Sequence, residues 1–113
     1  MAGIKHDSDK IRWELLPFDA LESVAKIFTH GAKKYNDRNW EAGMHYSRLY
    51  GAAMRHLSAW FMKRNGGIDQ EFGESHLAHA ACCILFLLAY EQRKMTKWDD
   101  RPDAGAVVKD EDF

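Results

Sequence analysis

Residues 75–90 read SHLAHAACCILFLLAY, and between Leu77 and Tyr90 every residue except His79 is apolar. The segment contains no proline or glycine, and apolar side chains on all faces are typical of a helix that is covered on every side. We therefore expect a central helix over about residues 74–94. Its apolar part is too short to span a bilayer. Two further helices from a short chain cannot cover it fully, so we expect a homodimer or homotetramer.

An earlier helix is predicted to begin at residues 16–19, LPFD. Proline is tolerated in the first turn of a helix, and aspartate suits its positive end. Apolar residues then recur at helical spacing from Ala20 to Phe28. Glycine is a typical residue at a helix end, so we expect this helix to stop at about His30, before Gly31.

A second amphipathic helix is predicted from Met44 to Arg64, ended by the glycines that follow it. Its expected buried stripe consists of Leu49, Ala53, His56, Leu57 and Trp60. Residues 31–43 show no period and are predicted to form a loop, and long loops in compact domains are often functional. The sequence thus predicts an all-α fold, a small helical bundle of three to four helices that is completed by oligomerisation.

The composition is that of one folded domain, with 113 residues, 46% of them hydrophobic and 29% charged. We expect an all-α domain over residues 1–95, which includes an irregular N-terminal arm, and a loose acidic tail over residues 96–113. The formal net charge of −1 argues against a nucleic acid polymer or a membrane as partner. Adjacent Cys82 and Cys83 are unsuited to a mutual disulfide and no apolar leader is present, so we expect a cytoplasmic protein.

Acidic residues and histidines come together before and within the third predicted helix. His76 and His79 are three positions apart and therefore share one helix face. The acids lie just upstream, at Asp69, Glu71 and Glu74. Carboxylates and imidazoles together bind divalent cations such as Mg²⁺, Mn²⁺, Fe²⁺ or Zn²⁺.

The second predicted helix adds one histidine and two arginines. His56 belongs to the apolar stripe, where an unpaired histidine is costly to bury, and this stripe faces the third helix. Arg48 and Arg55 lie one face over and are candidates for contacts with phosphate oxygens.

Simpler structural interpretations stay open at the level of the sequence. The histidine pair can be satisfied by the local acids, His56 can be a hydrogen-bonded core residue, and Asp69 can cap a turn. The arginines can lie on a solvated face, and Tyr35 and Trp40 can be loop aromatics that anchor the loop on the core.

Four sequence segments occur in a distinctive order. They are KHDSDKIR with LLP (5–12 and 15–17), GAKKY with NW (31–35 and 39–40), RHLSAW (55–60), and DQE with GESHLAHA (69–71 and 73–80). Together they resemble the dATP/dGTP diphosphohydrolase family of phages and bacteria, its phage MazZ-type members in particular, and the related MazG-like all-α pyrophosphohydrolases. Asp9 stands where the family usually has glycine, and His76-x-x-His79 stands where MazG-like enzymes carry Glu-x-x-Asp.

The resemblance implies metal-dependent hydrolysis of a purine (deoxy)nucleoside triphosphate between its α and β phosphates, which gives the monophosphate and pyrophosphate. The MazZ-type members imply dGTP or GTP as substrate, with the dGMP product feeding synthesis of the 2-aminoadenine nucleotide of modified phage DNA. A phage protein of this kind would act in the host cytoplasm, with Mg²⁺ or Mn²⁺ as its cofactor.

We combine the residue patterns and the resemblance into one predicted site. The metal ligands are His56, Asp69, Glu71, His76 and His79. The catalytic residues are Glu71 and Glu74, which would orient or deprotonate the attacking water. The substrate-binding residues are Lys10, Arg12, Lys34 and Arg55 for the phosphates, and Asn39 and Trp40 for the base.

Three alternatives remain beside this prediction. One is a dATP diphosphohydrolase, and another is a metal-dependent dNTP triphosphohydrolase. Enzymes of the latter kind usually carry an adjacent His-Asp pair, which occurs here only as His6-Asp7 in the arm. The third is a helical nucleotide-sensing or interaction module that uses the same pocket without turnover.

Overall fold

The computed structural model describes residues 2–103 and residue 111. Its α-helices are α1 (Phe18–Tyr35), α2 (Tyr46–Phe61) and α3 (His76–Gln92). Short 3-10 helices are η1 (Trp13–Leu15), η2 (Asn39–Ala42), η3 (Arg64–Gly67) and η4 (Thr96–Trp98). Extended pairing in this part of the chain is limited to an isolated bridge between Ile68 and Ser75. The predicted all-α fold is therefore confirmed. None of the helices found in these residues has the length and apolar character needed to cross a membrane.

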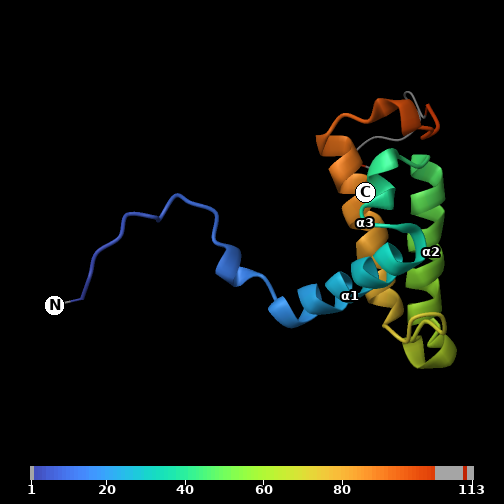
Figure 1. Ribbon diagram of the computed structural model, residues 1–113, viewed down its shortest axis with the longest axis horizontal. Helices are drawn as coiled ribbons and strands as arrows, with labels where there is room; N and C mark the ends of the chain where they lie inside the picture. Colours follow the sequence, from blue (N-terminus) through green and yellow to red (C-terminus); the bar gives the residue numbers. More distant parts are fainter. Residues whose placement is uncertain (1, 104–110, 112–113) are drawn as a thin grey trace.

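The central helix is α3, as predicted, because it contacts both other helices (Figure 1). Its first half packs against Ile27 of α1, and its second half packs against Tyr46 and Leu49 of α2. Tyr90 of α3 is fully buried, and its hydroxyl donates a hydrogen bond of 2.5 Å to the carbonyl oxygen of Trp40. This bond attaches the loop that contains η2 to the core.

The first helix is longer than predicted. It continues through Gly31 and ends only after Tyr35. The end is set by Asn36, which has a φ of 96° and donates its N–H to the carbonyl of Ala32 at 2.9 Å. Asparagine tolerates a positive φ better than most residues, whereas Gly31 keeps the helical backbone. Five residues that were predicted to lie in a loop, 31–35, are therefore helical.

The second helix is shorter than predicted, since the chain leaves it at Phe61 and enters η3. Of the predicted stripe, Leu49 and Ala53 are buried and His56 is half-buried. Leu57 and Trp60 remain 37% and 43% exposed. The outer part of this stripe is therefore not covered by the helices of the same chain.

The beginning of the predicted tail is not loose, because it packs against the helices. The indole of Trp98 occupies the space that a Cβ atom on Gly43 would need, so only glycine permits this contact. The carboxylate of Asp100 accepts hydrogen bonds from the N–H and the hydroxyl of Ser47, at 2.8 Å and 2.5 Å. It thereby caps the N-terminus of α2. Residues 104–110 and 112–113 of the tail lie outside the described residues.

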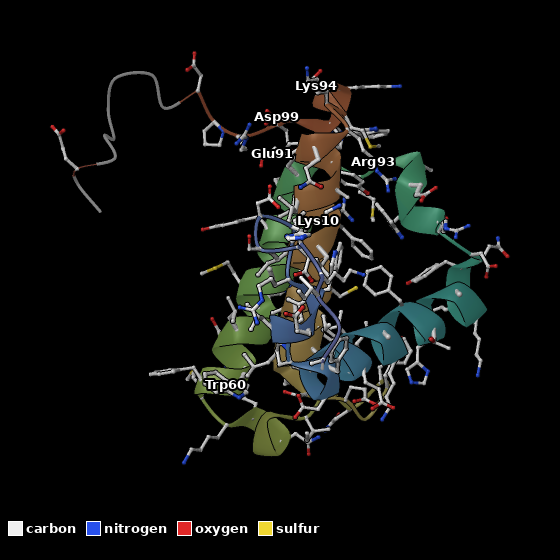
Figure 2. All side chains as sticks on the ribbon, turned by 90° about the vertical axis from the view of Figure 1, so that its left-hand side faces the viewer. Lys10, Trp60, Glu91, Arg93, Lys94 and Asp99 are labelled. Atoms are coloured by element: carbon white, nitrogen blue, oxygen red, sulfur yellow. The ribbon has the colours of Figure 1, made fainter. Side chains whose placement is uncertain are left out.

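The N-terminal arm extends to one side of the helices (Figure 1). Figure 2 views this arm end-on and labels Lys10 on it. All residues from Ala2 to Glu22 are exposed, including the first turn of α1.

Candidate functional site

The turn between η3 and α3 fixes the position of Asp69. The Oδ1 atom of Asp69 accepts hydrogen bonds from the backbone N–H groups of Glu71, at 2.9 Å, and Phe72, at 3.2 Å. The N–H of Asp69 donates to the carbonyl oxygen of Glu74 at 2.8 Å. Ser75 then caps α3, since its hydroxyl oxygen accepts a backbone N–H from the first turn at 3.1 Å. The aspartate is thus held beside the start of α3.

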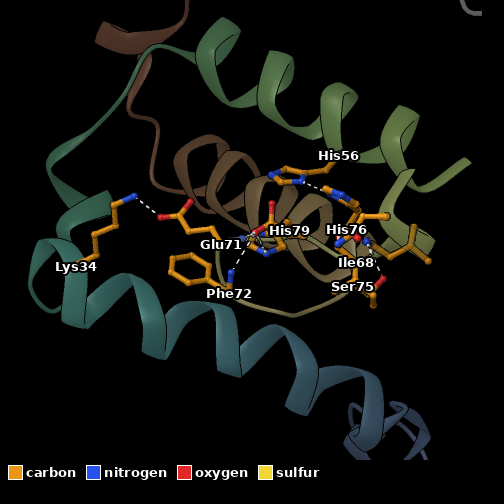
Figure 3. Close-up of polar contacts among 11 residues, drawn as sticks. Lys34, His56, Ile68, Glu71, Phe72, Ser75, His76 and His79 are labelled. Carbon is orange, nitrogen blue, oxygen red and sulfur yellow. Dashed lines mark hydrogen bonds and ion pairs between the residues drawn. The ribbon is translucent and has the colours of Figure 1, made fainter. Parts of the chain in front are cut away.

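Three histidines from two helices meet beside this aspartate (Figure 3). The Nδ1 atoms of His56, on α2, and His76, on α3, lie 2.8 Å apart. One ligand atom from each of His56, Asp69 and His76 lies within 4.8 Å of the other two, a spacing that allows a shared metal ion. The structure therefore brings together His56, Asp69 and His76, with His79 next to them.

His79 is buried, with 7% of its surface exposed, and its Nε2 atom has no hydrogen-bond partner among the described residues. That atom lies 3.5 Å from Oδ1 of Asp69, which is too long for a good hydrogen bond. A buried nitrogen without a partner costs free energy of folding. A divalent cation between the imidazoles and the carboxylate would supply the missing partner, so the donor set fits a metal ion.

A column of four stacked rings holds His79 in place. The ring centroids of His30 and Phe72 lie 4.8 Å apart, those of Phe72 and His79 5.7 Å, and those of His79 and His56 4.6 Å. The interplanar angles are 5°, 6° and 16°. The column connects α1, the turn before α3, α3 itself and α2. His30 and Phe72 were not predicted from the sequence, because neither belongs to a ligand pattern and their contact joins distant parts of the chain.

The site lowers the pKa values of its histidines. Burial lowers the pKa of His56 and of His79, and the neighbouring histidines lower them further, while Asp69 opposes this effect. Burial alone would raise the pKa of Asp69, but the backbone N–H groups of Phe72 and Glu71 and the nearby histidine charge outweigh it and lower that pKa. Neutral imidazoles beside an ionised carboxylate are the state that binds a cation.

A cleft of about 710 Å³ opens beside the histidines. It is lined by the three candidate ligands and by Arg55 and Arg64. Glu71 also lines the cleft, and Lys34 of α1 forms an ion pair of 2.5 Å with it (Figure 3); this contact raises the pKa of Lys34. Cationic side chains around a candidate metal site suit a phosphorylated ligand.

A second hollow, of about 700 Å³, lies between α1, η2 and α3 and has mostly apolar walls. Its lining includes Phe28, Tyr35, Asn39, Trp40, Phe72 and Phe86. Trp40 stacks on Phe86 at 5.1 Å, and the guanidinium of Arg93, near the C-terminal end of α3 in Figure 2, lies 5.0 Å from the centre of the Trp40 ring. Phe72 lines this apolar cavity and the preceding residue, Glu71, lines the cleft, so the turn before α3 contributes side chains to both hollows.

The remaining predicted residues lie elsewhere. Lys10 and Arg12 are on the exposed arm and line neither hollow, and Arg12 pairs with Glu14 at 2.7 Å. Glu74 supplies its carbonyl oxygen to the turn, and its charge acts on the pKa of His79. The structure thus separates the arm from the rest of the predicted site within one chain.

The comparisons with known proteins agree with the resemblance. The family model described as "dATP/dGTP diphosphohydrolase, N-terminal" matches residues 1–101, which include the arm, all three α-helices and η4. A dATP/dGTP diphosphohydrolase of Salmonella phage PMBT28 is 34% identical over 107 residues, which cover 95% of this chain and 36% of that relative. The chain therefore spans about a third of the length of the relative it matches. No solved structure gives a significant match. On the evidence of the family model, the chain belongs to the dATP/dGTP diphosphohydrolase, N-terminal family.

Proposed function

We propose that this chain is a metal-dependent enzyme that hydrolyses a purine (deoxy)nucleoside triphosphate, with dGTP or GTP as the first candidates, to the monophosphate and pyrophosphate. The observation that carries the proposal is the cluster of His56, Asp69 and His76, whose ligand atoms lie within 4.8 Å of one another. Beside it lies the Nε2 atom of His79, which has no hydrogen-bond partner in the part of the chain that the structure describes. Membership of the family and the name of the Salmonella phage relative support the same reaction class.

The metal would be held by His56, Asp69 and His76, with His79 as a further donor and Glu71 within the same cleft. When bound, a divalent ion neutralises phosphate charge and makes coordinated water more acidic. Imidazole nitrogens favour Mn²⁺ over Mg²⁺, because Mg²⁺ prefers oxygen ligands and retains water. Of the two expected cofactors we therefore favour Mn²⁺.

The chain itself would orient the reactants. Water attacks the α-phosphorus, the bond from that phosphorus to the bridging oxygen breaks, and pyrophosphate leaves. Glu71 lines the cleft with a half-exposed carboxylate, so it can accept the proton of the water, with Glu74 as the second candidate. Lys34 and Arg55 would contact phosphate oxygens, and Lys34 would exchange its ion pair with Glu71 for the substrate.

The apolar cavity is the proposed binding place of the base. Its volume of about 700 Å³ and its aromatic walls suit a purine ring, and the turn before α3 lines both this cavity and the cleft. Trp40 lies in its wall and can stack on the base, while the amide of Asn39 offers both a donor and an acceptor. An amide can pair with either purine edge, so dATP remains the alternative substrate.

The place of the reaction in metabolism follows from the resemblance. With dGTP as substrate, the dGMP product would feed synthesis of the 2-aminoadenine nucleotide in a phage-infected host cell. The exposed apolar residues on α2 and α3 support the further proposal that the working enzyme is a homodimer or homotetramer.

The test is to incubate the purified protein with dGTP, GTP, dATP and ATP, each with Mn²⁺ or Mg²⁺, and to separate the products by ion-exchange chromatography. We expect the nucleoside monophosphate and pyrophosphate from a guanine nucleotide, with faster turnover in Mn²⁺. Release of the intact triphosphate would identify a triphosphohydrolase instead. Binding of the nucleotide without any product would identify a sensing module.

A further inference from the structure

The N-terminal arm carries an apolar surface that the described residues of its own chain leave exposed. Its large apolar side chains are between 41% and 80% exposed, and they are Ile4, Ile11, Trp13, Leu15, Leu16 and Phe18. Isolated apolar side chains are common on protein surfaces, but such a density within fifteen residues is typical of a segment that binds another surface. The family model includes this arm, because its match begins at residue 1.

A receiving surface lies on α2. Tyr50, Met54, Leu57 and Phe61 recur at helical spacing and are between 37% and 80% exposed, so they form one uncovered apolar stripe. Met54 also lines the cleft that holds His56 and Arg55. If the apolar residues of an arm bind along this stripe, the cations beside them in the arm, Lys10 and Arg12, would lie at the edge of the phosphate cleft.

The direction of the arm favours the stripe of another copy of the chain. The arm joins α1 at its first residue, Phe18. In Figure 1 the arm leaves α1 on the side away from α2, with α1 and α3 between the arm and α2. The path of the arm therefore does not lead to the α2 stripe of its own chain, whereas a second copy can present its stripe to the arm.

We propose that the arm of one chain binds the apolar α2 stripe of a second copy, where its Lys10 and Arg12 complete the phosphate-binding cleft. The site would then take its metal ligands and base pocket from one subunit and two of its cations from the other. This inference rests on the proposed function for the role of the cations, whereas the binding of the arm to the stripe does not depend on catalysis.

Mixing of two inactive variants tests the shared site. One variant, Lys10→Ala with Arg12→Ala, lacks the arm cations, and the other, Asp69→Asn, lacks a metal ligand. After the two are unfolded and refolded together, about half of the dimers contain one chain of each variant, and one of the two sites in such a dimer is complete. We therefore expect about a quarter of the wild-type activity per chain. Activity that stays at the level of the separate variants would overturn the proposal. Lys26→Ala, an exposed cation on α1, is the matched control and should leave the activity unchanged.

A second measurement does not require activity. Hydrogen exchange of residues 4–16 should be slow in the wild-type oligomer and fast in Leu57→Asp, which places a charge in the α2 stripe. In sedimentation the same variant should be smaller than the wild type, while it still binds Mn²⁺. If these arm residues exchange equally fast in both proteins, the arm does not bind the stripe and the inference is wrong, even where the hydrolase activity is present. Absence of hydrolysis combined with a protected arm would instead reject only the proposed function.

Discussion

The Nδ1 atoms of His56 and His76 lie 2.8 Å apart although the two residues belong to different helices. Only one of two neutral imidazoles can donate in such a contact, so the pair is sensitive to any third group that binds it. One carboxylate oxygen of Asp69 lies within 4.8 Å of a ring nitrogen of each histidine, and the ring of His79 stacks on that of His56. The packing of α2 on α3 therefore determines the candidate metal site.

Replacement of His79 tests the site most directly. His79→Ala removes a buried imidazole whose Nε2 atom has no hydrogen-bond partner among the described residues, so we expect Mn²⁺ affinity to fall on the order of 10–100-fold and turnover to be lost. The helical content should persist, because α3 is held by its apolar residues and alanine favours helix. Calorimetric titration with Mn²⁺ and circular dichroism measure the two effects. Wild-type activity in a variant that has lost this imidazole would count heavily against the site.

The stability of the metal-free protein should depend on pH through His56 and His79. Both have a folded-state pKa below the ordinary value of 6.5, so the unfolded state binds protons more readily. The stability that the neutral histidines contribute is fully present above pH 6.5 and is lost as the pH falls through their folded pKa values. Urea unfolding in EDTA should show this decline as the pH falls below about 6.5.

The control for this pH dependence is His6→Ala, which removes a histidine from the exposed arm and should leave the profile unchanged. His56→Ala should flatten part of the decline. A profile with the opposite slope would mean that the histidines are charged in the folded protein. Saturating Mn²⁺ should raise the stability most at neutral pH, where the ligands are unprotonated.

The ion pair between Lys34 and Glu71 should matter more for activity than for stability. Both side chains are about half exposed, and water screens the attraction within such a pair, so it contributes little to the free energy of unfolding. Lys34→Ala should therefore shift the urea midpoint little, but it should raise the KM for the nucleotide because a phosphate contact is lost. Lys33→Ala is the matched control on the next residue. Equal effects of the two substitutions on KM would reject a specific role of Lys34.

The sequence predicted the helical bundle because apolar periodicity and helix propensity are local properties. It also predicted that His56, His76 and His79 lie together, since the spacing of residues on two adjacent helices defines the facing surfaces, and that Asp69 lies near them because it closely precedes α3 in the chain. The predicted end of α1 was wrong because two residues near it can each end a helix. Gly31 permits a stop, but Asn36 provides the actual one through its positive φ.

Contacts between distant segments could not be predicted in the same way. The stacking of His30 on Phe72 and the packing of Trp98 on Gly43 depend on how helices are placed relative to each other, and no period in the sequence encodes them. Lys10 and Arg12 were assigned to the phosphates from the resemblance, whereas the structure places them on an arm that lines neither hollow. Their role in phosphate binding remains a prediction, and it requires the arm of a second subunit to reach the cleft.

Tyr90 is expected to act on base binding through Trp40 without contact with the base. Its buried hydroxyl donates to the Trp40 carbonyl at 2.5 Å, so Tyr90→Phe leaves that oxygen without its donor at a cost of about 1–3 kcal/mol. The loop around η2 should become more mobile, and the KM for the nucleotide should rise more than kcat falls. Tyr50→Phe, which removes an exposed hydroxyl, is the control. A more mobile Trp40 in the wall of the apolar cavity should weaken binding of the base and therefore raise the KM. If Tyr90→Phe instead lowers kcat at unchanged KM, Tyr90 does not position Trp40 for the base.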